Sequence, residues 1–126
     1  MANPGLTKSF IAEAAVLPYR VVKFGTAAGQ VVQAAAAADA LVGVADNLGQ
    51  DTAGSRVDVI LEGIAEATAG AAITRGALLS ADSSGRVITA AASAGANVRV
   101  IGVAMDSAAA AGEIIPINVA PGSFQG

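Results

Sequence analysis

The sequence of 126 residues contains no cysteine, no histidine and no tryptophan. Without cysteine, the chain can form neither disulfide bonds nor cysteine-based zinc sites. Without histidine, it lacks the commonest general base and the commonest metal ligand, and a serine–histidine triad is impossible. No phosphate-binding or dinucleotide-binding glycine motif occurs either. We therefore expect no enzyme, and we identify no catalytic, cofactor-binding or metal-binding residues.

Charged and aromatic residues are both scarce. Charged residues make up 13% of the chain with a formal net charge of −3, so the basic surface of a nucleic-acid-binding protein is missing. Aromatic residues make up only 3%, although hydrophobic residues reach 54%. Alanine contributes little burial energy per residue, so the core must depend on valine, isoleucine and leucine. A core of this kind suggests added stability from self-association or from a partner surface.

Long apolar runs are also missing. No stretch reaches the roughly 18 strongly apolar residues that a membrane-spanning helix needs. The first residues lack the basic and leucine-rich regions of a signal peptide. We therefore expect a protein without a membrane segment, made in a cytoplasm.

One short pattern occurs twice. Leu41–Asp46 and Val100–Met105 each resemble a buried strand that contains one glycine, which usually marks a bulge or the close approach of another backbone. The flanking segments also match at a nearly constant spacing: Gly29–Val32 with Gly85–Ile88, and Ala53–Val59 with Ala111–Ile117. This pattern predicts an internal two-fold repeat, with modules at about 19–63 and 75–122. The alternative is chance similarity between short, alanine-rich segments.

Short apolar segments alternate with turns rich in glycine, asparagine, aspartate and serine along the chain. This spacing predicts an all-β fold, a small β-barrel or sandwich. Arg56–Glu62 is the clearest strand, with Val57, Val59 and Leu61 on one face and Arg56, Asp58 and Ile60 on the other. Ile64–Ala67 is expected to form a separate strand.

Two alanine-rich segments, Ala34–Ala40 and Ala90–Ala96, leave an alternative open. We expect the first to be a loop or a single helical turn, because seven residues cannot hold a helix alone. If both formed true helices, the fold would be mixed. Near the end of the chain, Pro116 predicts that the last strand, Glu113–Val119, lies at a sheet edge or a bulge. Residues 121–126 are expected to form a short tail.

The first 18 residues differ from the β-rich domain predicted for residues 19–126. They contain Pro4, Gly5 and Pro18, together with an apolar stretch that includes one lysine. One interpretation is an extended N-terminal arm that docks on a neighbouring protein through its larger side chains. The other is a first strand or a frayed terminus. The candidate binding residues of the arm are Leu6, Lys8, Phe10 and Ile11.

Two groups of acidic and amide side chains are candidate chemical sites. Asp46, Asn47 and Asp51 do not meet the spacing of an EF-hand calcium loop, and such residues are common in turns. Asp58 and Glu62 share a strand face at a separation of roughly 13 Å, which is too far for shared acid–base work. We interpret both groups as ordinary turn and surface residues.

An ordered series of motifs points to a family. It comprises Lys23–Gly25, Val42–Ala45, Arg75–Ser80, Gly85–Val87, Ile101–Ala104 and a closing Ile115–Val119. The series resembles the small capsid cement, or head-decoration, proteins of tailed bacteriophages and prophages. The resemblance implies a β-rich domain that binds the outside of an assembled phage head. It also implies oligomers, most often trimers, where capsid subunits meet.

The resulting hypothesis is a structural protein on the outer surface of the virion, made in the host cytoplasm. Its expected partners are the major capsid protein and other copies of itself, and the arm residues would contact the capsid. The alternative is a surface-exposed binding module on a virion that attaches to the host surface or to a glycan. The absence of tryptophan and the single tyrosine disfavour this alternative, since sugar platforms generally use exposed aromatic rings.

Overall fold

The computed structural model describes residues 3–91 and 97–125. These ranges contain nine strands and no helix, so the predicted all-β class is confirmed and the mixed alternative is wrong for the described residues. The strands are β1 (Asn3–Ala12), β2 (Val21–Phe24), β3 (Gln30–Gln33), β4 (Leu41–Ala45), β5 (Arg56–Thr68), β6 (Leu78–Ala81), β7 (Val87–Thr89), β8 (Asn97–Ala104) and β9 (Ile114–Gln125).

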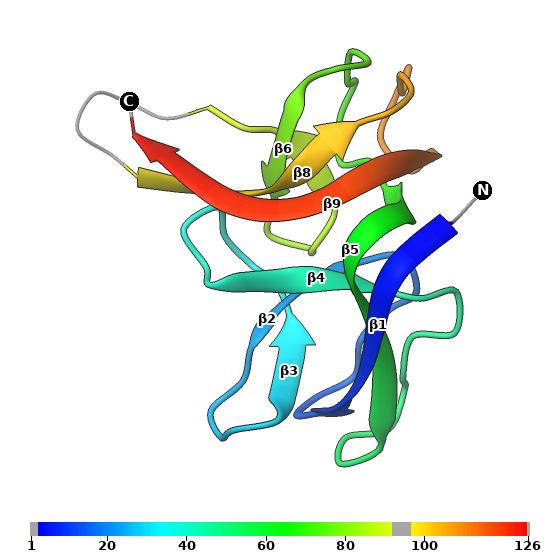
Figure 1. The fold of residues 1–126 in the computed structure, drawn as a ribbon, viewed down its shortest axis with the longest axis vertical. Helices are drawn as coiled ribbons and strands as arrows, with labels where there is room; N and C mark the ends of the chain where they lie inside the picture. The colour runs from blue at the N-terminus through cyan, green and yellow to red at the C-terminus, as the bar shows by residue number, and fades with distance from the viewer. Residues whose placement is uncertain (1–2, 92–96, 126) are drawn as a thin grey trace.

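The first half of the chain forms a closed barrel of five strands, in the lower part of Figure 1. Its strands follow the order β1-β3-β2-β4-β5, and β5 pairs with β1 to close the ring. The β1–β3 contact is parallel and brief, with Ile11 and Ala12 opposite Gln30 and Val31. The other pairs in the barrel are antiparallel.

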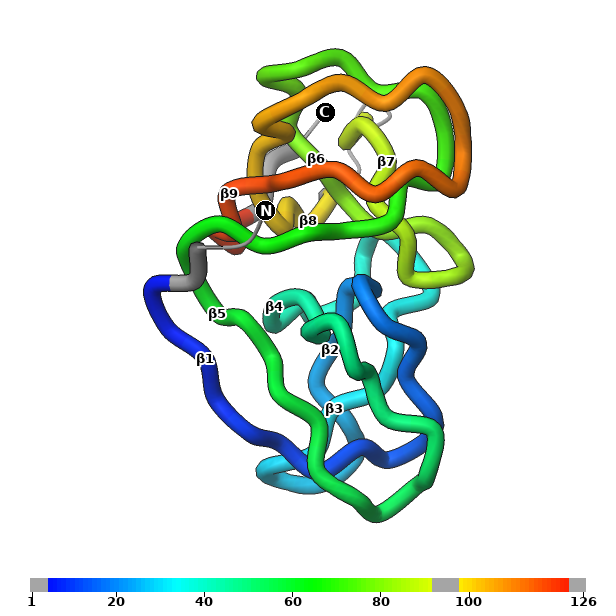
Figure 2. The backbone as a smooth tube through the Cα atoms, turned by 90° about the vertical axis from the view of Figure 1, so that its right-hand side faces the viewer, coloured from blue at the N-terminus to red at the C-terminus, as the bar shows by residue number. Residues whose placement is uncertain are grey.

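Strand β5 continues out of this barrel into the second half, as Figure 2 shows. Gly63 has a φ of 96° at the middle of the strand, a conformation that glycine adopts without steric cost. Beyond this point β5 pairs with β9, and the sheet continues through β8 and β6 to β7. The predicted break between two strands at Gly63 is therefore wrong, because the glycine bends one strand rather than ending it.

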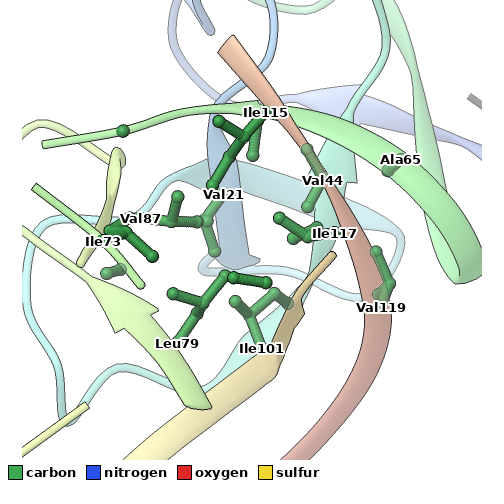
Figure 3. Close-up of a cluster of buried hydrophobic side chains, with 14 of the residues drawn as sticks. Val21, Val44, Ala65, Ile73, Leu79, Val87, Ile101, Ile115, Ile117 and Val119 are labelled. Carbon is green, nitrogen blue, oxygen red and sulfur yellow. The ribbon is translucent and has the colours of Figure 1, made fainter. Parts of the chain in front are cut away.

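The larger hydrophobic cluster joins the two halves. In Figure 3, Val21 and Val44 of the first half lie with Leu79, Ile101 and Ile117 of the second. A smaller cluster fills the first barrel and includes Phe10 and Val57. Strand β4 lies between the clusters and is buried at all five positions. This double burial explains why β4 is a continuous apolar run rather than an alternating pattern.

The two glycines of the repeated pattern lie where backbones approach closely, as their position predicted. A methyl group added at Gly43 would collide with the carbonyl oxygen of Ile60, and one at Gly102 with the carbonyl oxygen of Asn118. The pairing of β8 with β9 is also irregular between Val100 and Gly102. Glycine is therefore a packing requirement at both positions.

The internal repeat stays a prediction, but the two halves share details of backbone hydrogen bonding. In the first half, the Ala12 N–H donates to the Ser55 carbonyl, and the Ala12 carbonyl accepts from the Gly54 N–H. In the second half, the Ala69 N–H donates to the Glu113 carbonyl, and the Ala69 carbonyl accepts from the Gly112 N–H. An isolated parallel bridge between Ala69 and Val87 brings β7 beside the end of β5, as β3 lies beside the end of β1.

Two predictions for the last strand are wrong. Strand β9 lies between β5 and β8, so Pro116 is at neither an edge nor a bulge. The Pro116 carbonyl accepts a hydrogen bond from Met105, so its nitrogen faces the same side, just where β8 ends at Ala104. The missing N–H therefore removes only the reciprocal bond to the Met105 carbonyl, at the very end of the β8–β9 ladder. The expected tail is part of β9, because the first residues of β8 offer it a partner strand up to Gln125.

The first alanine-rich segment is a loop, as predicted. It contains no strand or helix between Ala34 and Ala40, and the Asp39 carboxylate accepts hydrogen bonds from the N–H groups of Ala35 and Ala36 at 2.9 Å. The second segment, Ala90–Ala96, lies largely outside the described residues.

Candidate functional site

Of the predicted arm, residues 1–18, the segment Asn3–Ala12 forms strand β1. It pairs antiparallel with β5 from Asn3 opposite Ile64 to Ile11 opposite Arg56. On its other side, β1 pairs with β3 only at Ile11 and Ala12. The strand is thus part of the barrel wall, and most of its length has a neighbouring strand on one side only.

The four candidate arm residues differ in exposure. Leu6 is 49% exposed, and Lys8 is exposed with its Nζ 5.5 Å from the centre of the Phe10 ring. Phe10 is only 8% exposed and belongs to the core of the first barrel. Ile11 is half-buried, and its N–H donates to the carbonyl of Gly29 at 2.9 Å. Leu6 and Lys8 are therefore available to a partner, whereas Phe10 and Ile11 hold β1 in place.

Strand β1 also has a free backbone edge. Backbone groups of alternate residues point to the same side of a strand. Since the Ile11 N–H faces β3, the N–H and C=O groups of Thr7 and Ser9 face that side too. No strand pairs with them there among the described residues. The residues from Gly5 to Ser9 are all exposed, so this edge is open to solvent. Sequence reasoning missed the edge, because it depends on where the pairing with β3 stops.

Two neighbouring hollows lie along the outer face of β1 and β5. The larger, of about 490 Å³, is lined by residues that include Ser9, Asp46 and Asp58. The smaller, of about 400 Å³, is lined by residues that include Thr7, Asp46 and Ile60. The Ser9 hydroxyl donates to the Asp58 carboxylate at 2.5 Å. Asp46 accepts hydrogen bonds from the backbone of Leu48 and Gly49, so it acts as a turn residue.

Tyr19 lines the smaller hollow with a strained backbone. Its φ of 60° makes it the one non-glycine residue with positive φ in the described part of the chain. Its N–H donates to the Asp46 carbonyl at 3.2 Å, and its own carbonyl accepts from Thr68 at 2.9 Å. These two bonds hold a conformation that costs about 1–2 kcal/mol in a non-glycine residue.

Arg20 connects the two halves beside this tyrosine. Its guanidinium donates to the carbonyl of Ser84, in the turn between β6 and β7, at 2.8 Å. Burial lowers the pKa of Arg20, the charge of Arg86 lowers it further, and Asp82 opposes this shift. The Nε of Arg20 is buried without a hydrogen-bond partner. Arg20 thus fixes the turn to the first barrel at the cost of one unmade hydrogen bond.

Two carboxylates hold loops of the first barrel. Hydrogen bonds from the backbone and hydroxyl of Thr26 lower the pKa of Glu13 below its usual value. Burial alone would raise the pKa of Asp39, but the N–H of Ala35 and the charge of Lys23 lower it overall. The Lys23 Nζ lies 3.4 Å from the Asp39 carboxylate. Both carboxylates therefore have structural roles.

Within residues 3–91 and 97–125, no group of three or more aspartate or glutamate side chains is arranged to hold a metal ion. No helix in these ranges is long and apolar enough to cross a membrane.

Comparisons with known proteins extend these observations. The model of a family described as phage cement protein matches residues 5–119. No curated protein matches the chain. Among solved structures, the N base of head fiber gp8.5 of bacteriophage phi29 is similar, with a TM-score of 0.66 and 16% sequence identity. The match covers 91% of this chain and 93% of the phi29 chain. At this identity the likeness shows a shared fold.

Proposed function

Because the chain belongs to the phage cement protein family, and is therefore a structural protein of the phage head, we propose that it binds the outer surface of the assembled capsid and stabilises it. The observation that carries this proposal is the extent of the family match, from residue 5 in β1 to residue 119 in β9, which includes both halves of the fold. The role is structural rather than catalytic. The partner is the major capsid protein, which the chain meets after synthesis in the host cytoplasm.

The proposed mechanism is the addition of contacts across boundaries between capsid subunits. The chain acts as a homotrimer, as its resemblance to decoration proteins implies. Once one subunit of a trimer is bound, the second and third bind at a high effective concentration, so modest contacts add up to firm attachment. The small side chains and thin core of the chain favour such self-association.

The proposed contact surface is the exposed part of β1. Leu6 supplies an apolar contact and Lys8 a positive charge, and both are accessible. Phe10 and Ile11 contribute indirectly, because they hold β1 against the barrel core and β3. This division separates the candidate residues that bind from those that position the strand.

The test is a sedimentation assay with heads that lack this protein. The wild-type chain should pellet with the heads, and Leu6→Ala combined with Lys8→Ala should pellet less. Leu78→Ala is the matched control, since Leu78 is 47% exposed, much like Leu6, but lies in β6 of the second half. Light scattering should give three times the 12.1 kDa chain mass. Binding to host cells but not to heads would overturn the proposal in favour of a host-attachment module.

A further inference from the structure

We propose that the free edge of β1 receives an extended strand of the major capsid protein, which adds to the barrel wall beside Thr7 and Ser9. This inference rests on the proposed function and names how the contact is made. The partner is defined by its chemistry: a segment of extended backbone with an acidic side chain near Lys8. Strand addition of this kind takes its affinity from main-chain hydrogen bonds.

The open side of β1 supplies unpaired backbone groups. Thr7 and Ser9 each direct one N–H and one C=O away from β5, and no strand of the described residues pairs with them. These groups lie two residues apart, at the spacing at which an added strand forms its bonds. One extended segment can therefore make about four hydrogen bonds here.

A single lysine protects this part of the edge. Native sheets usually protect their edges with lysine, proline, bulges, inward charges or a covering loop. Along β1, Pro4 and the register irregularities precede Thr7. At Thr7–Ser9 the strand is regular and exposed, and its one charge is Lys8, whose Nζ lies over the Phe10 ring. A lysine here opposes pairing with another lysine but favours an incoming strand that carries a carboxylate.

The charge of Lys8 favours the capsid protein over the β1 edge of a second copy of this chain. Two copies that paired through the same β1 edge would run antiparallel about a two-fold axis and bring their Lys8 residues together. Like charges on neighbouring strands destabilise the pair, whereas a carboxylate near Lys8 would stabilise it. The edge is therefore poorly matched to the β1 edge of a second copy, and well matched to a strand of another chain that carries an acidic residue.

The experiment compares Thr7→Pro with Thr7→Ala. Proline removes the N–H that faces the open side, and it leaves the β1–β5 bonds intact because the Thr7 N–H does not face β5. Alanine removes the same side chain but keeps the N–H. Thr7→Pro should bind heads about tenfold more weakly or worse, and Thr7→Ala should bind like the wild type. Circular dichroism and melting temperature establish that both variants are folded.

Hydrogen exchange of the wild-type protein provides a measurement that does not depend on a variant folding. The Thr7 and Ser9 amides should exchange quickly in the free protein and slowly on heads. If the wild type binds heads but Thr7→Pro binds equally well, or if these amides stay unprotected, strand addition is overturned and the proposed function stands. Slow exchange already present in the free oligomer would instead assign the edge to a second copy. If the wild type does not bind heads, the proposed function itself fails.

Discussion

Replacing Gly102 with alanine directly tests how closely the backbones of β8 and β9 approach each other. In β8, a Cβ at this position would collide with the carbonyl oxygen of Asn118 and lie 3.2 Å from the Cα of Val119, both in β9. These atoms belong to the backbone, so no side chain can rotate to make room. Strand β9 must move away from β8, and part of their ladder must break.

The expected loss of unfolding free energy is the sum of two costs, offset in part by one gain. Overpacking in a well-packed region costs about 1–3 kcal/mol. Loss of one or two ladder hydrogen bonds adds about 1 kcal/mol each. Alanine recovers about 0.5–1 kcal/mol, because it loses less backbone entropy than glycine on folding. The net loss is about 1–4.5 kcal/mol, which for a chain of this length lowers the melting temperature by about 4–18 °C.

The assay is thermal unfolding followed by circular dichroism, with Gly122→Ala as the matched control. Gly122 also lies in the β8–β9 pair, but a Cβ there meets no atom within 4 Å. The control should melt about 2–4 °C above the wild type, since alanine recovers the same 0.5–1 kcal/mol there without a clash. Similar melting temperatures for the two variants would refute the close approach of β8 and β9 at Gly102.

Three further predictions follow from the first barrel. Phe10→Ala should lower the free energy of unfolding in urea by about 3–5 kcal/mol, because Phe10 is buried in the barrel core. Leu6→Ala should change it by no more than about 0.5 kcal/mol, because Leu6 is exposed. Equal losses would contradict the assignment of Phe10 to the core and of Leu6 to the surface. Tyr19→Gly should be about 1 kcal/mol more stable than Tyr19→Ala, since only glycine adopts the left-handed backbone freely; the opposite order would argue against that conformation. Because the folded-state pKa of Asp39 is lowered, its contribution to stability is present above the unfolded pKa of about 3.8 and is lost as the pH falls through the lower, folded value. Asp39→Asn should therefore be less stable than the wild type at pH 7, and the gap should close in acid; a gap that is independent of pH would show that the carboxylate charge is not involved.

Sequence patterns predicted the parts of the fold that depend on local chemistry. The alternation in Arg56–Glu62 placed Val57, Val59 and Leu61 on the face that fills the first barrel. The repeated glycines marked close backbone contacts because no other residue fits there. The ordered motifs pointed to the family that the comparison then showed.

Features that depend on distant segments could not be predicted in this way. Ile60 shares a face with two exposed charged residues, and it is buried only because the second half covers it. Pro116 is tolerated in a central strand because β8 ends beside it. For the candidate site, the sequence identified the β1 segment but not its free edge, which depends on where β3 stops pairing. The strain at Tyr19 has no sequence signal, since tyrosine is not a residue that favours positive φ.

The shared strand β5 has a consequence for how mechanical load passes through the molecule. Strand β1 pairs with β5 over Arg56–Ile64, and β9 pairs with it over Gly63–Thr68. A pull between β1 and β9 along the strand axis is therefore transmitted through β5, and it loads the hydrogen bonds of each ladder together in shear. Peeling at right angles would break the same bonds one at a time, so resistance to force should depend on its direction.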